Sequence, residues 1–481
     1  MNQKQYPKLA LYIDGQWLPQ ASGGEIPVIN PADEAPLALL PLAGASELDL
    51  ALAAAEKGYA VWKKTAALER QKIISRAMQL VRERAPGIAC ALTLEQGKPY
   101  PEALREVLLS TEIIDFLAEE GKRLYSRGVP PRSANILSQV VSRQPVGPVA
   151  AFTPWNFPAN LPARKLGGAL SAGCSIIIKP AEETPASCLE FVRAFHDAGL
   201  PPGVLNMVCG RPAEVSAHLI AAPAIRKVSF TGSVAVGRQL GLLAAQGIKR
   251  YTAELGGHAP VIVCQDADAQ QAAKASVAAK YRNGGQVCVS PTRFYVHAAK
   301  FAEFRDAFVH GAGTIKVGSG LDEGVAMGPL VHARRLDDMQ RLVDDAVACG
   351  GKLLCGGRRL GDSGFFYAPT VLAEVPPQAQ VMRQEPFGPI AVLQSFDKLD
   401  AAIAAANSLP YGLAAYAFTH DLETAHRLGE ELEAGMVGIN HYGVSQPETP
   451  FGGWKESGHG QESGPEGLQG YTDVKFCSIA K

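Results

Sequence analysis

The sequence has almost no net charge and no long apolar segment. Its 46 Lys and Arg residues nearly balance its 47 Asp and Glu residues, so the formal net charge is -1, and like charges never form a run of five. A general nucleic-acid binder needs an excess of positive charge, so this class of protein is excluded. No apolar run approaches the ~18 residues that cross a membrane. We therefore expect a protein with no nucleic-acid partner and no membrane anchor.

Paired cysteines are missing as well. The nine cysteines are scattered from Cys90 to Cys477, with no CxxC pair and no Cys/His cluster at metal-ligand spacing. This pattern favours a reducing compartment over a disulfide framework and gives no metal site. Residues 1–18 also lack the apolar core of roughly 7–15 residues that a secretory signal requires. We expect a cytoplasmic protein without a metal.

The sequence that remains has the pattern of an α/β protein, and its 481 residues are enough for about two to four units with cores of their own. Residues 46–121 are helix-rich, with Ser46 as the expected N-cap of a helix that ends near Trp62 and apolar residues at helical spacing over 68–84. From Val146 onward, short apolar strands alternate with helices. The predicted strands are 149–153, 175–179, 204–208 and 227–230, and the predicted helices are 161–172, 185–198, 213–222 and 234–243.

This alternation predicts βαβ units and a parallel sheet. A second alternating region runs from Pro260 to about Asn440, so we expect two α/β lobes with a cleft between them. The stretch 123–144 fits neither lobe, and with residues 463–481 it is expected to form an exposed β-arm that pairs with another subunit. The predicted division is therefore 1–122 with 145–256 as one lobe and 257–462 as the other.

The surroundings of Cys288 differ from those of the other cysteines. Cys288 follows Gly284 and Gly285, and Arg282 and Arg293 flank the turn. A thiol attacks as the thiolate, nearby cations lower its pKa, and paired glycines let amide N–H groups approach a reacting atom. The sequence therefore predicts that Cys288 is an activated nucleophile.

Parallel sheets bind ligands at the carboxyl ends of their strands, so the residues after each predicted strand are candidates for a site. Gly232 and Ser233 follow a strand and open a helix, where they form either an ordinary loop or a pyrophosphate site. Lys179 and Glu182 are either a solvated turn or ligands of ribose hydroxyls. In the second case the carboxylate repels a 2′-phosphate, which favours NAD over NADP.

Glu254 and Asn156 each have two interpretations from the residues alone. Glu254 ends a predicted strand, either as a structural cap or as a base that takes a proton from water. Asn156 lies in the turn 154–158 (Pro-Trp-Asn-Phe-Pro), either as a satisfied loop amide or as a preorganised donor to an oxyanion. Their occurrence in one chain with Cys288 favours the chemical interpretation.

These motifs together resemble the NAD(P)-dependent aldehyde dehydrogenase superfamily in order and spacing, over nearly the whole chain. The segments that carry the resemblance are 154–158, Lys179, 230–233, 254–257 (Glu-Leu-Gly-Gly), 285–288 (Gly-Gln-Val-Cys) and 385–389. The resemblance implies two Rossmann-like parallel-sheet lobes plus a β-arm for oligomerisation into a homodimer or homotetramer. Residues 1–122 and 145–256 then form the NAD-binding domain, and residues 257–462 form the catalytic domain.

The resemblance also implies roles for individual residues. Cys288 is the implied nucleophile, Glu254 the general base and Asn156 the oxyanion-hole amide. The implied cofactor is NAD, with NADP as the alternative. Its implied binding residues are Thr153, Pro154, Trp155, Lys179, Glu182, Gly232, Ser233, Leu255, Gly256, Glu385 and Phe387. In the implied reaction the thiolate adds to an aldehyde, a hydride passes to the nicotinamide, and water activated by Glu254 hydrolyses the thioester.

The implied substrate is an acidic semialdehyde. Arg164, Arg282 and Ser445 resemble the positions at which succinate-semialdehyde dehydrogenases hold the distal carboxylate, a group that a guanidinium suits. Segments such as 129–132 (Val-Pro-Pro-Arg) are similar to 2-oxoglutarate semialdehyde dehydrogenases. Succinate semialdehyde is therefore the first expectation, and 2-oxoglutarate semialdehyde and glutarate semialdehyde are the alternatives. An inactive structural relative and a cysteine hydrolase are the alternatives from other classes.

Overall fold

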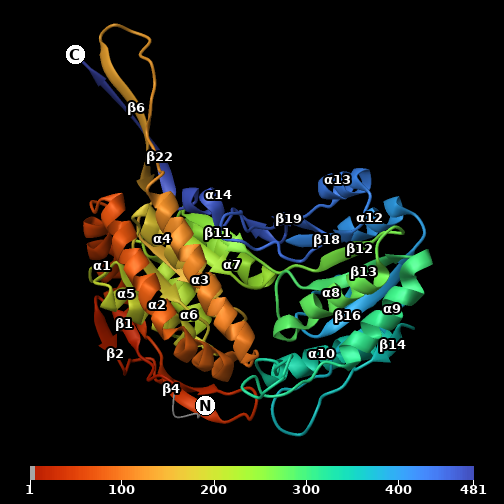
Figure 1. The fold of residues 1–481 in the computed structure, drawn as a ribbon. Coiled ribbons are helices and arrows are strands. Elements are labelled where there is room, and N and C mark those ends of the chain that lie inside the picture. Colours follow the sequence, from red (N-terminus) through yellow and green to blue (C-terminus); the bar gives the residue numbers. More distant parts are fainter. Residues whose placement is uncertain (1–5) are drawn as a thin grey trace.

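The computed structural model describes residues 6–481, which form two α/β lobes side by side and a narrow arm that projects from one of them (Figure 1). The first sheet orders its described strands β2-β1-β9-β8-β7-β10-β11-β21. The five central strands β9, β8, β7, β10 and β11 run parallel, whereas β1, β2 and β21 pair antiparallel at the edges. The bounds are β1 Leu11–Ile13, β2 Gln16–Leu18, β7 Val149–Phe152, β8 Ile176–Lys179, β9 Leu205–Met207, β10 Lys227–Thr231, β11 Arg250–Glu254 and β21 Gly458–His459.

Four helices connect the parallel strands of the first sheet within the described chain, as a parallel arrangement requires. They are α4 Asn160–Ala172, α5 Pro185–Asp197, α6 Pro212–Ala221 and α7 Val234–Gln246. The predicted alternation of strands and helices from Val146 onward is therefore confirmed. Each observed element begins and ends within three residues of its predicted limit.

The second lobe repeats this arrangement in the order β14-β15-β16-β13-β12-β18-β19, in which only the β14–β15 pair of the described strands is antiparallel. Its strands are β12 Ala259–Val263, β13 Pro291–His297, β14 Lys352–Cys355, β15 Thr370–Ala373, β16 Ile390–Phe396, β18 Ala414–Phe418 and β19 Met436–Ile439. Its helices are α8 Ala269–Tyr281, α9 Ala298–Gly313, α10 Ala333–Ala348, α11 Gln380–Arg383, α12 Leu399–Asn407 and α13 Leu422–Glu431. The second predicted α/β lobe is confirmed.

Three N-terminal helices cover the first lobe: α1 Ala45–Trp62, α2 Ala67–Gln96 and α3 Tyr100–Gly121. Ser46 is not the N-cap of α1, because Gly44 holds that position and donates its amide to Glu47 at 2.8 Å, while the Ser46 hydroxyl meets that of Ser22. Within residues 6–481, every helix is too short or too polar to cross a membrane. Two small antiparallel pairs complete the lobes, β3 Glu25–Ile29 with β4 Pro36–Pro41 and β17 Tyr411–Gly412 with β20 Trp454–Lys455.

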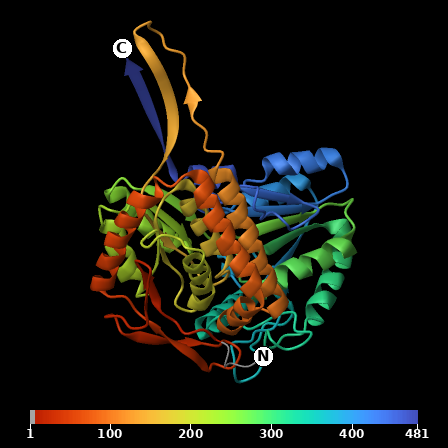
Figure 2. The same ribbon diagram turned by 60° about the vertical axis from the view of Figure 1, so that its left-hand side comes forward.

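The arm is a three-stranded ribbon that stands clear of both lobes (Figure 2). Its middle strand, β6 (Ile136–Pro145), pairs antiparallel with β5 (Arg127–Gly128) and with β22 (Thr472–Ala480). Apolar side chains are exposed along it, namely Leu137, Val474, Phe476 and Ile479. The short helix α14 (Gly464–Gln469) lies against α3 and α4 and leads into β22.

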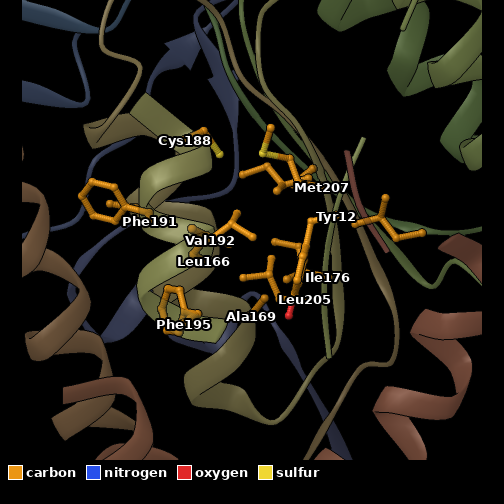
Figure 3. Packing of buried hydrophobic residues seen from close by; sticks show 14 of the residues in the cluster. Tyr12, Leu166, Ala169, Ile176, Cys188, Phe191, Val192, Phe195, Leu205 and Met207 are labelled. Carbon is orange, nitrogen blue, oxygen red and sulfur yellow. The ribbon is translucent and has the colours of Figure 1, made fainter. Parts of the chain in front are cut away.

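The core of the first lobe forms where helices α4 and α5 pack on the sheet. Figure 3 shows the apolar face of α5 turned toward strands β8 and β9, with α4 beside it. The residues in this contact include Leu166, Ala169, Ile176, Cys188, Val192, Leu205 and Met207, whereas the Phe191 ring lies on the opposite side of α5. Their burial removes apolar surface from water and fixes the carboxyl ends of the strands, where the predicted site residues begin.

Candidate active site

Cys288 lies in the turn between α8 and β13. The 3-10 helix η2 (Arg282–Gly285) follows α8 directly, and its last three residues have φ angles of 49°, 60° and 71°. Glycine adopts such left-handed conformations without steric cost. A Cβ on Gly285 would also clash with the main-chain oxygen of Gly388. Only glycine therefore allows this close approach between the Cys288 turn and the segment around Gly388.

Burial dominates the acidity of the Cys288 thiol. Burial raises its pKa to about 12, the carboxyls of Glu385 and Glu254 act in the same direction, and Arg164 opposes them. The guanidinium of Arg293 is turned away and donates to three main-chain oxygens. The prediction that the flanking cations lower this pKa is therefore wrong, because the hydration that the thiolate of the half-buried Cys288 loses outweighs the attraction of Arg164, the cation that opposes the shift.

The raised pKa of Cys288 predicts slow alkylation of the protein without its cofactor. The rate with iodoacetamide should increase about tenfold per pH unit between about pH 7 and 10, because the thiolate fraction increases tenfold with each unit below the pKa. Mass spectrometry of the peptide that contains Cys288 measures this rate. The peptide that contains the exposed Cys477 controls for changes in the reagent. A Cys288 rate that is already maximal at pH 7 contradicts the raised pKa.

Glu254 is the last residue of β11 and is 1% exposed. Neither of its carboxyl oxygens has a hydrogen-bond partner among residues 6–481. Burial and repulsion from Glu462 raise the pKa of Glu254 well above its usual range, and Lys165 and Arg164 oppose this shift. A carboxyl group with a raised pKa and no fixed partner is suited to take up and release a proton near neutral pH.

Asn156 is buried in the turn that follows β7. Its side-chain Nδ2 donates to the main-chain oxygen of Gln286 at 3.2 Å, which ties the amide to the turn of Cys288. Cys288, Glu254 and Arg164 lie close enough that the charges of Glu254 and Arg164 alter the pKa of the thiol. The structure thus brings Cys288, Glu254 and Arg164 together from separate segments of the chain.

The predicted cofactor residues form two groups at the carboxyl edge of the first sheet. The first group follows β7, β8 and β10 and contains Thr153, Pro154, Trp155, Lys179, Glu182, Gly232 and Ser233. Lys179 ends β8 and forms an ion pair with Glu182. Ser233 caps α7 by accepting a hydrogen bond from the amide of Val236 at 3.4 Å. The hydroxyl of Thr153 is buried and has no hydrogen-bond partner in the described part of the chain.

The second group lies where the two lobes meet and contains Leu255, Gly256, Glu385 and Phe387. A Cβ on Gly256 would clash with the carboxyl group of Glu385, whose pKa burial raises to about 8. The ring of Phe387 meets that of Trp155 edge-on at a centroid distance of 5.4 Å, so the two groups adjoin. A helix N-terminus, an unpartnered buried hydroxyl and closely packed glycines fit a bound dinucleotide.

A cavity of about 1090 Å³ opens beside Cys288 and is lined by Arg164, Arg282 and Ser445. Its wall also contains the aromatic side chains of Phe157, Tyr442 and Phe451. The three predicted substrate residues therefore share one space with the candidate nucleophile. A cavity with apolar walls and a few polar groups is typical of a small-molecule site.

The two predicted arginines of the cavity differ in their surroundings. Arg164 is buried, donates to Ser445 at 2.8 Å and to Ser463, and stacks 4.3 Å from the centre of the Phe451 ring. The guanidinium of Arg282 has no hydrogen bond or ion pair with any residue from 6 to 481, and it lies 5.7 Å from the centre of the Phe157 ring. Of the two predicted arginines, Arg282 is therefore the one that is available to a ligand, while Arg105 and Lys274 are further cations of the same cavity.

Two buried ion pairs beside the site were not among the predicted residues. Lys98 pairs with Glu106, and Lys165 pairs with Glu462, with every partner 3% exposed or less in its side chain. The signal in the sequence is weak, because a charged residue in a helix usually faces solvent. No group of three or more His, Cys, Asp or Glu residues within the described chain is placed to hold a metal ion.

Residues 17–477 match the aldehyde dehydrogenase family. The chain is 47% identical to 4-(hydroxymethyl)benzenesulfonate dehydrogenase of Comamonas testosteroni and 40% identical to the NADP(+) succinate-semialdehyde dehydrogenase of Escherichia coli K12, each over 97% of both chains. Its fold is similar to the crystal structure of succinate-semialdehyde dehydrogenase from Burkholderia pseudomallei, with a TM-score of 0.96, 40% identity and coverage of 100% of this chain and 99% of that one. The resemblance inferred from the motifs is confirmed. The chain belongs to the aldehyde dehydrogenase family.

Proposed function

We propose that the protein uses NAD(P) to oxidise an aldehyde with a distal anionic group, and that succinate semialdehyde, which yields succinate, is the first candidate. The observation that carries this proposal is the cavity beside Cys288, which contains an arginine without a hydrogen-bonding or ionic partner in the described chain. A nucleophile and an uncommitted guanidinium in one cavity suit a substrate with a reactive carbonyl at one end and an anion at the other.

Cys288 is the proposed nucleophile, Asn156 the oxyanion donor and Glu254 the general base. The Cys288 thiol releases its proton to water, and the resulting thiolate adds to the aldehyde carbonyl. The Asn156 amide and the Cys288 main-chain N–H stabilise the negative oxygen. Arg164, which already lowers the pKa of the thiol, stabilises the thiolate. Bound NAD(P)+ supplies the hydride acceptor. Glu254 takes a proton from the water that cleaves the thioester, and this returns the free thiol.

NAD is the proposed cofactor, with NADP as the alternative. The residues that would hold it are Thr153, Pro154, Trp155, Lys179, Glu182, Gly232, Ser233, Leu255, Gly256, Glu385 and Phe387. The carboxylate of Glu182 disfavours a 2′-phosphate. Its ion pair with Lys179 neutralises part of that charge, so we expect a preference for NAD and not an exclusion of NADP.

An aromatic aldehyde with a sulfonate group is the second candidate substrate. The relative from Comamonas testosteroni, which is named for a benzenesulfonate, has a higher identity than the succinate-semialdehyde dehydrogenase, 47% against 40%. Phe157, Tyr442 and Phe451 on the cavity wall offer ring faces and edges to a benzene ring. 2-Oxoglutarate semialdehyde and glutarate semialdehyde are the aliphatic alternatives, and Arg282 suits a carboxylate or a sulfonate.

Replacing Arg282 by alanine should raise the KM for the acidic substrate by about tenfold to a hundredfold, because a charge-assisted hydrogen bond is lost, and should change the KM for propionaldehyde little. The measurement is kcat/KM for succinate semialdehyde, 2-oxoglutarate semialdehyde, glutarate semialdehyde, 4-sulfobenzaldehyde and propionaldehyde, with each cofactor. Arg105→Ala is the matched control, because Arg105 is an exposed cation that lines the same cavity. Equal effects of Arg282→Ala on acidic and neutral aldehydes contradict the anion-binding role.

The arm, residues 123–144 with 463–481, is proposed to join subunits into a homodimer or homotetramer, because an exposed ribbon with apolar side chains is a surface for pairing. We further propose residues 1–122 with 145–256 as the NAD-binding domain and 257–462 as the catalytic domain. The cytoplasm is the proposed location, since the described cysteines are unpaired. An inactive structural relative is the alternative from another class, and formation of reduced nicotinamide with any of these aldehydes contradicts it.

A further inference from the structure

The turn that carries Asn156 has no secondary structure of its own. It leaves the sheet at the end of β7 and enters α4 at Asn160. Buried main-chain groups in such a turn need hydrogen-bond partners from elsewhere in the fold. The partners of this turn therefore fix where the Asn156 amide stands relative to Cys288.

Lys98 and Glu106 supply several of these partners. Lys98 lies between α2 and α3, and its Nζ donates to Glu106 at 2.6 Å and to the main-chain oxygen of Asn156 at 2.8 Å. The other carboxylate oxygen of Glu106 accepts from the amides of Ala159 at 2.9 Å and Asn160 at 3.2 Å. The ion pair therefore binds the turn both before and after Phe157 in the sequence, and the Lys98 ammonium lies 4.0 Å from the centre of the Phe157 ring.

A second connection joins the same region to the nucleophile turn. Gln96 donates to the Asn283 side chain at 2.9 Å, and Asn283 donates in turn to the main-chain oxygen of Asn156 at 2.9 Å. The carbonyl of Asn156 therefore accepts from both Lys98 and Asn283. One hydrogen-bonded network thus fixes the position of the Asn156 turn relative to the Cys288 turn.

The ion pair is unusual for its depth, because the side chains of Lys98 and Glu106 are 1% and 3% exposed. Two charges taken out of water lose hydration that their mutual attraction only partly replaces. Here the remaining hydrogen-bonding capacity of each charge is used on the backbone of one turn, and a carboxylate at the start of α4 also suits the positive end of a helix. Both residues border the cavity beside Cys288, but their charged groups are occupied by each other and by the turn.

We propose that Lys98 and Glu106 are positioning residues, which act through the turn 156–160 to hold the Asn156 amide where the oxyanion forms. This inference rests on the proposed role of Asn156. It predicts that the pair affects kcat more than KM, because the oxyanion develops only in the transition state.

The test is a double-mutant cycle between the ion pair and Asn156. Lys98→Met with Glu106→Gln removes both charges together, so no unpaired charge stays buried, and the glutamine oxygen still accepts from Ala159 and Asn160. We expect kcat to fall about tenfold to a hundredfold with little change in KM. In protein that already carries Asn156→Ala, the same pair of changes should have no further effect on kcat. If the combined variant does not fold, Glu106→Gln alone serves in the same cycle.

Lys227→Met is the control, because Lys227 is a buried lysine that donates to Thr252 and lies outside this network. Its effect on kcat should be the same fold-change with and without Asn156→Ala. The inference is overturned if the Lys98 and Glu106 changes leave kcat unchanged. It is also overturned if they lower kcat by the same factor with and without Asn156→Ala, because an equal loss indicates a general structural role. If Asn156→Ala itself retains full turnover, the proposed oxyanion role of Asn156 fails, and that result is separate from the other two.

Discussion

Replacement of Cys288 by alanine is expected to lower kcat/KM for the acidic aldehyde by a factor on the order of 10⁴ or more, the scale on which the loss of a catalytic nucleophile acts. Among the described cysteines, only Cys288 lines the cavity, so no other thiol can take its place. A stopped-flow assay of reduced nicotinamide measures the loss. Cys288→Ser should lose activity on a similar scale, because a serine hydroxyl ionises even less readily than a cysteine thiol at the same site.

The control for the Cys288 variants is Cys477→Ala, which changes an exposed cysteine of the arm. It should retain full activity, and both Cys288 variants should still bind the cofactor, as quenching of protein fluorescence would report. If Cys288→Ala or Cys288→Ser oxidised the aldehyde at a near-native rate, Cys288 would not be the nucleophile.

Replacement of Glu254 by glutamine is expected to preserve the first turnover and to slow all later ones by about 10²–10⁴-fold. Glutamine has nearly the same shape, but it cannot accept the proton of the water that cleaves the thioester. The expected trace is a burst of reduced nicotinamide, equal to the enzyme concentration, followed by a slow steady rate. Glu102→Gln is the matched control, since Glu102 is a half-buried carboxyl of the same cavity whose pKa is also raised by desolvation.

The pKa of Glu254 also sets the direction of the pH dependence. Because burial raises this pKa, the protonated and inactive form persists to higher pH than for an ordinary carboxyl. The steady rate of the unmodified enzyme and of Glu102→Gln should therefore increase as the pH rises through the Glu254 pKa. Glu254→Gln should lack that increase, and a variant that shows no burst and an unchanged pH profile contradicts the role of general base.

Much of the fold is predictable because its elements have local signals. The strands of both lobes are short apolar segments, and the helices between them have apolar faces at regular spacing, so the alternation appears in the sequence itself. The prediction that Ser46 is the N-cap of α1 shows where local signals fail. Ser46 has the right residue type for an N-cap, but Ser22, which is distant in sequence, occupies its hydroxyl, while Glu47 takes the amide of Gly44.

The site is less predictable, because its electrostatics depend on burial. Arg293 follows Cys288 by only five residues in the sequence, yet its guanidinium donates to main-chain oxygens, and the pKa of the thiol is raised instead of lowered. Arg164 and Arg282 are equivalent as residue types, and only the structure distinguishes the hydrogen-bonded guanidinium from the free one. The pairing of Lys98 with Glu106 and the turn of Asn156 is likewise a product of tertiary packing, which leaves no motif.

The pairing of the arm also orders the steps by which the protein is made. Val141 of β6 pairs with Phe476 of β22, and the entire second sheet is encoded between them. A ribosome therefore synthesises β6 long before its partner strand, and both lobes are able to collapse while that edge is still open. An open edge strand is a site for aggregation. We therefore expect the arm to close late in synthesis, after the strands of both lobes have been made.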